Sequence, residues 1–94
     1  IIKNKMNLII KVSSDNYDEW RKVFDGHKER AKVCDESKTT VGKIDDKTCI
    51  VMMYEVDMNG LQELMSSEYL QRMTKELSIV NEEMHSFEPL TPTQ

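Results

Sequence analysis

The chain has 94 residues, the length of one small domain. Its 13 Lys and Arg residues against 17 Asp and Glu residues give a net charge of −4, and no basic cluster offers a surface for a phosphate backbone or an anionic membrane. The longest apolar run, residues 50–54, is too short to cross a bilayer, and residues 1–5 lack the apolar core of a secretory leader. We therefore expect a cytoplasmic protein with neither a nucleic-acid nor a membrane partner.

Alternating apolar residues predict a first strand over residues 6–12, preceded by an extension over residues 1–5. Asp15 is the expected N-cap of the helix that follows. In this helix apolar side chains recur at spacings of three and four residues, which places them on one stripe. The members of the stripe are Tyr17, Trp20, Phe24, His27, Ala31 and Cys34.

The second half of the chain predicts two strands, a helix and a last strand. The strands are expected over residues 39–44 and 48–56, joined by a turn at Asp45 and Asp46. Asp57 is the expected N-cap of a helix over residues 59–77, which Ser66 and Ser67 either break or cap again. A last strand is expected over residues 84–90, followed by a tail over residues 91–94.

This order of elements is typical of an α+β, ferredoxin-like fold, in which two helices cover one face of a four-stranded antiparallel sheet. The strand over residues 48–56 is apolar on both faces. We expect one set of its side chains to face the helices, namely Ile50, Met52, Tyr54 and Val56. The other face would carry an uncovered apolar patch made of Ile9, Val51, Met53 and Phe87. Such patches mark interfaces, so we expect residues 1–94 to form one domain that dimerises through this face.

A resemblance to a known family extends over most of the chain, residues 6–90. The residues that carry it are Tyr17-Asp18-Glu19-Trp20, Phe24, His27, Arg30, Gly42, Asp45-Asp46, Val56-Asp57 and Ser66-Ser67-Glu68-Tyr69-Leu70. In these features the chain resembles the dimeric α+β barrel superfamily, and within it small stand-alone proteins related to antibiotic-biosynthesis monooxygenases, many of them labelled cyclases. The resemblance implies a homodimer packed sheet to sheet, with a pocket between the helices and the sheet of each subunit.

His27 is the candidate catalytic residue, because an imidazole that titrates near neutrality can move a proton or orient a ligand. The residues expected to line the pocket are Trp20, Phe24, His27, Met52, Tyr54 and Tyr69. Each has a plainer interpretation as a core residue, and for His27 that interpretation is a buried imidazole bonded to the backbone or to a carboxylate.

We expect neither a metal nor a cofactor. Cys34 and Cys49 stand alone in the sequence, so free thiols are expected, with a Cys34–Cys49 disulfide as the alternative. The adjacent acids Asp45 and Asp46 are expected to be solvated turn residues. The glycine-rich motifs that bind nucleotides are absent from the sequence. In haem-degrading members of the superfamily a histidine on the second helix holds the iron. The expected second helix here, residues 59–77, contains no histidine, so we do not expect haem degradation.

Three functions remain open. The first is a dimer that binds a small apolar or aromatic molecule, and the second is a cofactor-independent monooxygenase or cyclase-like enzyme in which His27 assists proton transfer. The third is a structural or regulatory dimer with a filled core and no ligand. A His27 side chain open to a cavity would favour the first two functions, and a sealed side chain would favour the third.

Overall fold

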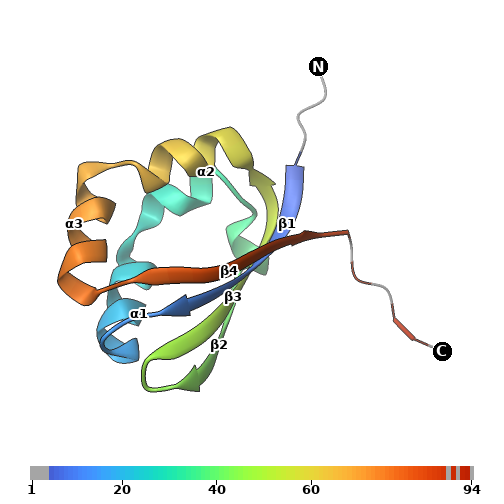
Figure 1. The fold of residues 1–94 in the computed structure, drawn as a ribbon. Coiled ribbons are helices and arrows are strands. Elements are labelled where there is room, and N and C mark those ends of the chain that lie inside the picture. Colours follow the sequence, from blue (N-terminus) through green and yellow to red (C-terminus); the bar gives the residue numbers. More distant parts are fainter. Residues whose placement is uncertain (1–4, 89, 91, 94) are drawn as a thin grey trace.

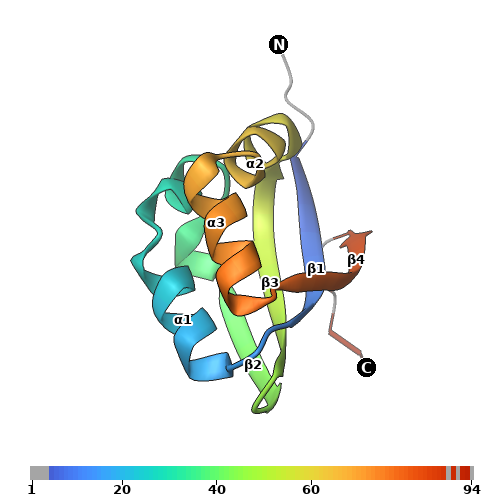
Figure 2. The ribbon, with the colours of Figure 1, turned by 60° about the vertical axis from the view of Figure 1, so that its left-hand side comes forward.

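The computed structural model describes residues 5–88, 90, 92 and 93, which form an antiparallel sheet with helices on one face (Figures 1 and 2). The strands are β1 (Lys5–Ser13), β2 (Thr40–Asp45), β3 (Thr48–Asp57) and β4 (Val80–Phe87). The α-helices are α1 (Tyr17–Gly26), α2 (Met58–Met65) and α3 (Glu68–Leu77), and two short 3₁₀ helices are η1 (Lys28–Lys32) and η2 (Glu36–Lys38).

The predicted α+β class and the four-stranded antiparallel sheet are confirmed. The strands follow the order β2-β3-β1-β4, and each neighbouring pair is antiparallel. This arrangement is consistent with a ferredoxin-like fold. Figure 2 shows all three α-helices on one side of the sheet, so among the described residues no helix lies over the opposite face. None of the helices in the described residues is both long and apolar enough to traverse a bilayer.

The first helix is shorter than predicted. It ends at Gly26, and the chain turns at His27 (φ −89°, ψ 88°) before it continues as η1. A glycine is a poor helix former, so the helix ends where the sequence pattern alone predicts that it continues. Its N-cap is Asn16, whose side-chain oxygen accepts a hydrogen bond from the backbone N–H of Glu19, and the prediction of Asp15 is wrong by one residue.

Other boundaries agree with the sequence more closely. Asp57 caps α2 as predicted, since its carboxylate accepts a hydrogen bond of 3.2 Å from the backbone N–H of Gly60. Ser66 and Ser67 interrupt the predicted second helix, and the Ser67 hydroxyl caps α3. Strand β4 begins at Val80, four residues earlier than predicted, because residues 80 and 81 pair with β1. The predicted extension and tail lie mostly outside the described residues, and Lys5 belongs to β1.

The core lies between the sheet and the helices. Its buried members are Leu8, Ile10, Val12, Trp20, Val33, Cys49, Val51, Met53, Val56 and Leu61. Val51 and Met53 are only 2% and 3% exposed, so the prediction that they lie on the uncovered face is wrong. They face the helices.

A β-bulge explains why regular alternation places Val56 in the wrong set of β3 side chains. Met53 pairs with Leu8 and Val56 pairs with Met6, so Tyr54 and Glu55 together lie opposite the single residue Asn7. Glu55 has a positive φ of 52°, which is the strained conformation of such a site. The extra residue places Val56 on the same face as Met53 instead of the opposite one.

The helix-free face therefore carries a different apolar set. Its members are Ile9, Ile50, Met52, Tyr54 and Phe87, all of them partly exposed. The rings of Tyr54 and Phe87 meet edge to face at a centroid distance of 6.0 Å. Of the predicted patch, Ile9 and Phe87 remain on this face.

Candidate functional site

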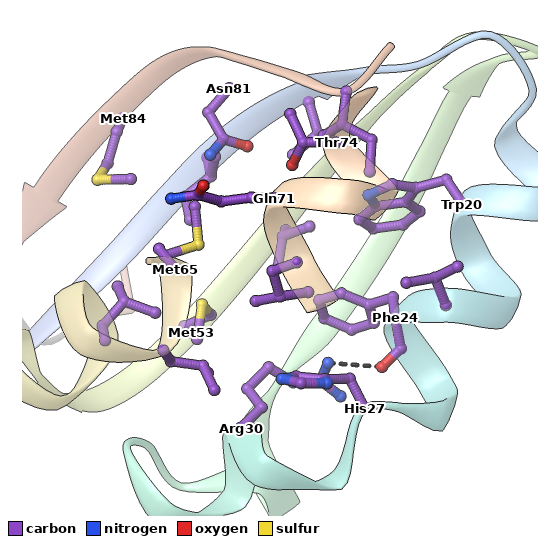
Figure 3. Close-up of a pocket in the computed structure, with 18 of the residues that line it drawn as sticks. Trp20, Phe24, His27, Arg30, Met53, Met65, Gln71, Thr74, Asn81 and Met84 are labelled. Atoms are coloured by element: carbon purple, nitrogen blue, oxygen red, sulfur yellow. Dashed lines mark hydrogen bonds between the residues drawn. The ribbon is translucent and has the colours of Figure 1, made fainter. Parts of the chain in front are cut away.

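A cavity of about 490 Å³ lies between the three α-helices and the sheet (Figure 3). Most of its lining is apolar: Ile10, Val12, Trp20, Val23, Phe24, Val51, Met53, Leu61, Leu64, Met65, Leu70, Ile79 and Met84. The polar lining residues are His27, Arg30, Gln71, Thr74, Lys75 and Asn81. A concave apolar space with a few polar groups is the usual form of a small-molecule site.

The cavity exists because α3 stands away from the sheet. None of the residues of α3, all of which are described, is buried. Two exposed lining residues mark the mouth of the cavity: Met65, at the end of α2, is 44% exposed, and Met84, in β4, is 43% exposed. Figure 3 shows Asn81 and Met84 on one side of the cavity and His27 and Arg30 on the other.

Helix α1 contributes an aromatic wall. Trp20 is 6% exposed, and its ring stacks on the Phe24 ring at a centroid distance of 4.9 Å. The two side chains are four residues apart, so one turn of α1 places them on the same face. The Arg30 guanidinium covers the Phe24 ring at 3.6 Å. An aromatic wall of this kind is suited to flat or extended apolar ligands.

His27 lies at the turn where α1 ends. Its ring stacks on the Tyr69 ring of α3 at a centroid distance of 5.6 Å, with the planes 9° apart. Its Nε2 atom is buried and has no hydrogen-bond partner among the described residues. The expected bond from this imidazole to the backbone or to a carboxylate is therefore not found at Nε2. An unsatisfied buried nitrogen is unfavourable by about 1–3 kcal/mol, which a ligand or a small side-chain movement would relieve.

Arg30 is a site residue that was not among the predicted pocket residues. It is 8% exposed, its Nη1 donates a hydrogen bond of 2.6 Å to the carbonyl oxygen of Phe24, and its Nε and Nη2 both contact the Glu36 carboxylate. The hydrogen bonds from Arg30 lower the pKa of Glu36 below its usual value. A separation of six residues between Arg30 and Glu36 is not a helical neighbour spacing, so no sequence pattern indicates this pair.

The structure brings together three of the six predicted pocket residues. Trp20, Phe24 and His27 line the cavity. Tyr69 contacts the His27 ring but is 41% exposed and is not part of the lining. Met52 and Tyr54 lie on the helix-free face because of the register of β3, so the prediction that they line the pocket is wrong.

The two cysteines are both free, as predicted. Burial raises the pKa of the Cys49 thiol to about 11, and it also raises the pKa of the Cys34 thiol. Both thiols are therefore protonated near neutral pH and are poor nucleophiles. Among the described residues, no three His, Cys, Asp or Glu side chains come close enough to hold a metal ion.

Comparisons of the chain with protein-family models, with curated proteins and with solved structures find no match. The cavity and its lining residues are therefore the basis on which a function is inferred.

Proposed function

We propose that the protein binds a small apolar or aromatic molecule in the cavity between its helices and its sheet. The observation that carries this proposal is an apolar space of about 490 Å³ with an exposed mouth. This volume is within the range of about 300–1,000 Å³ that is common for ligand sites. Protein interiors are normally packed with few voids larger than a water molecule, so an apolar space of this size supports a binding role.

The same cavity weighs against a structural or regulatory dimer with a filled core. In such a protein α3 would bury its apolar side against the sheet. Instead, Leu70 and Met73 remain partly exposed, and Leu70 lines the open space. His27 also lines the cavity, which supports the two functions that need a ligand.

A fluorescence titration tests the binding function. Trp20 is the one tryptophan of the chain and lines the cavity, so a bound molecule should change its emission. With a panel of apolar and aromatic compounds we expect saturable changes together with an increase in Tm, because a ligand that binds the folded state stabilises it. A panel in which no compound gives either change would contradict the proposal.

Two matched variants of α3 locate the binding site. Thr74→Phe places a bulky ring on a residue that lines the mouth, and we expect it to weaken binding at least tenfold. Glu76→Phe adds the same ring two residues away, on an exposed position that does not line the cavity, and should leave the dissociation constant within twofold of the original. Equal effects of the two variants would place the ligand elsewhere.

A cofactor-independent monooxygenase is the second candidate, and the unpartnered Nε2 of His27 is the observation that favours it. One phenol and one O₂ give one quinone and one water, so the aromatic substrate supplies all the electrons. After a movement of the imidazole that opens its buried Nε2 to the cavity, His27 would take the phenolic proton, which makes the phenol easier to oxidise. Oxygen uptake with a panel of hydroxyaromatic compounds, lost in His27→Ala while ligand binding persists, is the expected result. Uptake that His27→Ala leaves unchanged would exclude this role of His27.

We also propose that two copies of the chain pack sheet to sheet, as the resemblance to the dimeric α+β barrel superfamily implies. The helix-free face supports this, because its centre is apolar. Ile9 pairs directly with Met52 there, and Tyr54 and Phe87 pack beside them. A second copy is the occupant whose face has the same size and the same apolar centre.

A further inference from the structure

We infer that the ligand is an amphiphile with an aliphatic body and a carboxylate head, and that the head binds at the mouth of the cavity beside Lys75. This inference rests on the proposed binding function and adds the chemical class of the ligand. Three features of the cavity support it: the sign of its charges, the position of Lys75 and the nature of its apolar walls.

The lining is free of acids. None of the described residues that line the cavity is Asp or Glu, although the whole chain has 17 acids and 13 basic residues. The two charged side chains in the lining are Arg30 and Lys75. Since Glu36 already neutralises Arg30 through two contacts, the remaining positive charge of the cavity comes from Lys75.

Lys75 has no carboxylate partner within 4 Å in the part of the chain that the structure describes. Several other exposed lysines do have one, as in the pairs Lys22–Glu19 and Lys32–Glu29. Lys75 shares the cavity lining with three neutral polar residues, Gln71, Thr74 and Asn81. A lysine whose charge is not already paired can form a charge-assisted hydrogen bond with a carboxylate.

The position of Lys75 determines the orientation of the ligand. Lys75 is exposed, so a carboxylate beside it keeps part of its hydration and avoids the large penalty of a buried charge. The body of the ligand would then extend inward, toward the aromatic wall formed by Trp20 and Phe24. Polar groups at the mouth and apolar groups inside match a molecule with one charged end.

Three methionines make the walls adaptable. Met53, Met65 and Met84 line the cavity, and two of them flank the mouth. Methionine side chains are unbranched and flexible, so they can repack around a chain that itself has many conformations. This favours a flexible aliphatic body over a rigid one of fixed outline.

The test compares ligands that differ only in the head group. Binding of dodecanoate and dodecanol, each below its aggregation concentration, is followed by Trp20 fluorescence in the original protein, in Lys75→Gln and in Lys47→Gln. Lys47 is an exposed turn lysine outside the cavity lining and serves as the control. We expect dodecanoate to bind about fivefold more tightly than dodecanol, which corresponds to an exposed ion pair of about 1 kcal/mol.

In Lys75→Gln the acid should bind no more tightly than the alcohol, and Lys47→Gln should behave like the original protein. Added salt should weaken binding of the acid alone, because salt screens an exposed charge pair. As a second variant, Lys75→Glu should bind dodecylammonium more tightly than the original protein does. This gain of binding cannot arise from misfolding.

The outcomes separate the two proposals. If the original protein binds the alcohol as tightly as the acid, or if Lys75→Gln keeps the preference, the inference is wrong while the binding function stands. If neither ligand binds, the inference is also wrong, and the panel of apolar and aromatic compounds then decides the binding function by itself.

Discussion

Arg30 holds together the part of the cavity lining where α1 ends. Its guanidinium is almost fully buried and joins three groups: the Phe24 carbonyl, the Phe24 ring and the Glu36 carboxylate. We expect Arg30→Met to lower the free energy of unfolding by about 2 kcal/mol, because the carbonyl and the partly exposed carboxylate lose their partner. The exposed pair Arg21–Asp25 offers a control, and Arg21→Met should change stability by about 0.5 kcal/mol or less. Urea unfolding at pH 7 measures both, and equal losses would contradict the structural role of Arg30.

The Arg30–Glu36 pair also predicts a pH dependence. The hydrogen bonds from Arg30 lower the pKa of Glu36 from its ordinary value of 4.5, so the folded protein binds this proton less readily than the unfolded chain does. The stabilisation is therefore complete above pH 4.5 and is lost as the pH falls through the lowered value. The stability difference between the original protein and Arg30→Met should shrink on acidification from pH 6 to pH 3. Urea titrations at several pH values check this, and a difference that grows at low pH would contradict it.

At the scale of elements, two helical glycines differ in the space that surrounds them. A Cβ on Gly60 of α2 would lie 2.8 Å from a methyl carbon of Val33 and 3.1 Å from the cap carboxylate of Asp57. We expect Gly60→Ala to destabilise the protein by about 1–3 kcal/mol, because Val33 is buried and has little room to move. A Cβ on Gly26 at the end of α1 would meet no described atom within 4 Å, so Gly26→Ala should stabilise by up to about 1 kcal/mol. Thermal unfolding of the two variants should show Tm shifts of opposite sign.

The elements also show what the sequence could predict. The strands, the Asp57 cap and the serine break between α2 and α3 follow from local patterns, because each depends on residues that are neighbours along the chain. The inward face of β3 does not follow from such a pattern. That strand is apolar on both sides, and the bulge at Glu55 exchanges the faces of the residues that follow it. Alternation alone therefore groups Met52 and Tyr54 with Val56, although only Val56 faces the helices.

For the candidate site, the helical stripe is the informative signal. Trp20, Phe24 and His27 follow the spacing of one helix face, and all three line the cavity. Arg30 is not predicted by this spacing because it lies beyond the end of α1, in η1. The mouth of the cavity could not be predicted either. It depends on the distance of α3 from the sheet, which is set by tertiary packing and not by local periodicity.

At the scale of the whole molecule, the helix-free face is the basis of the proposed dimer. A standard interface removes about 800 Å² per chain from water, and its apolar part corresponds to a gross gain of about 10 kcal/mol per chain. Association is opposed by about 4–15 kcal/mol for the pair of chains, so the balance favours a dimer. A monomer of this length would instead leave Ile9, Met52 and Tyr54 partly exposed to water, as they are in the single chain.

Sedimentation equilibrium at micromolar concentration is the measurement. We expect a particle of twice the 11.0 kDa of one chain. Met52→Lys places a charge at the centre of the helix-free face and should shift the protein to monomers, because a buried unpaired ammonium is strongly unfavourable. Gln62→Lys adds the same charge on the exposed side of α2 and should leave the dimer unchanged. An original protein that sediments at 11.0 kDa, or a Met52→Lys variant that remains a dimer, would show that this face is not the interface. Because the cavity lies on the other side of the sheet, the monomeric variant should still bind the ligand.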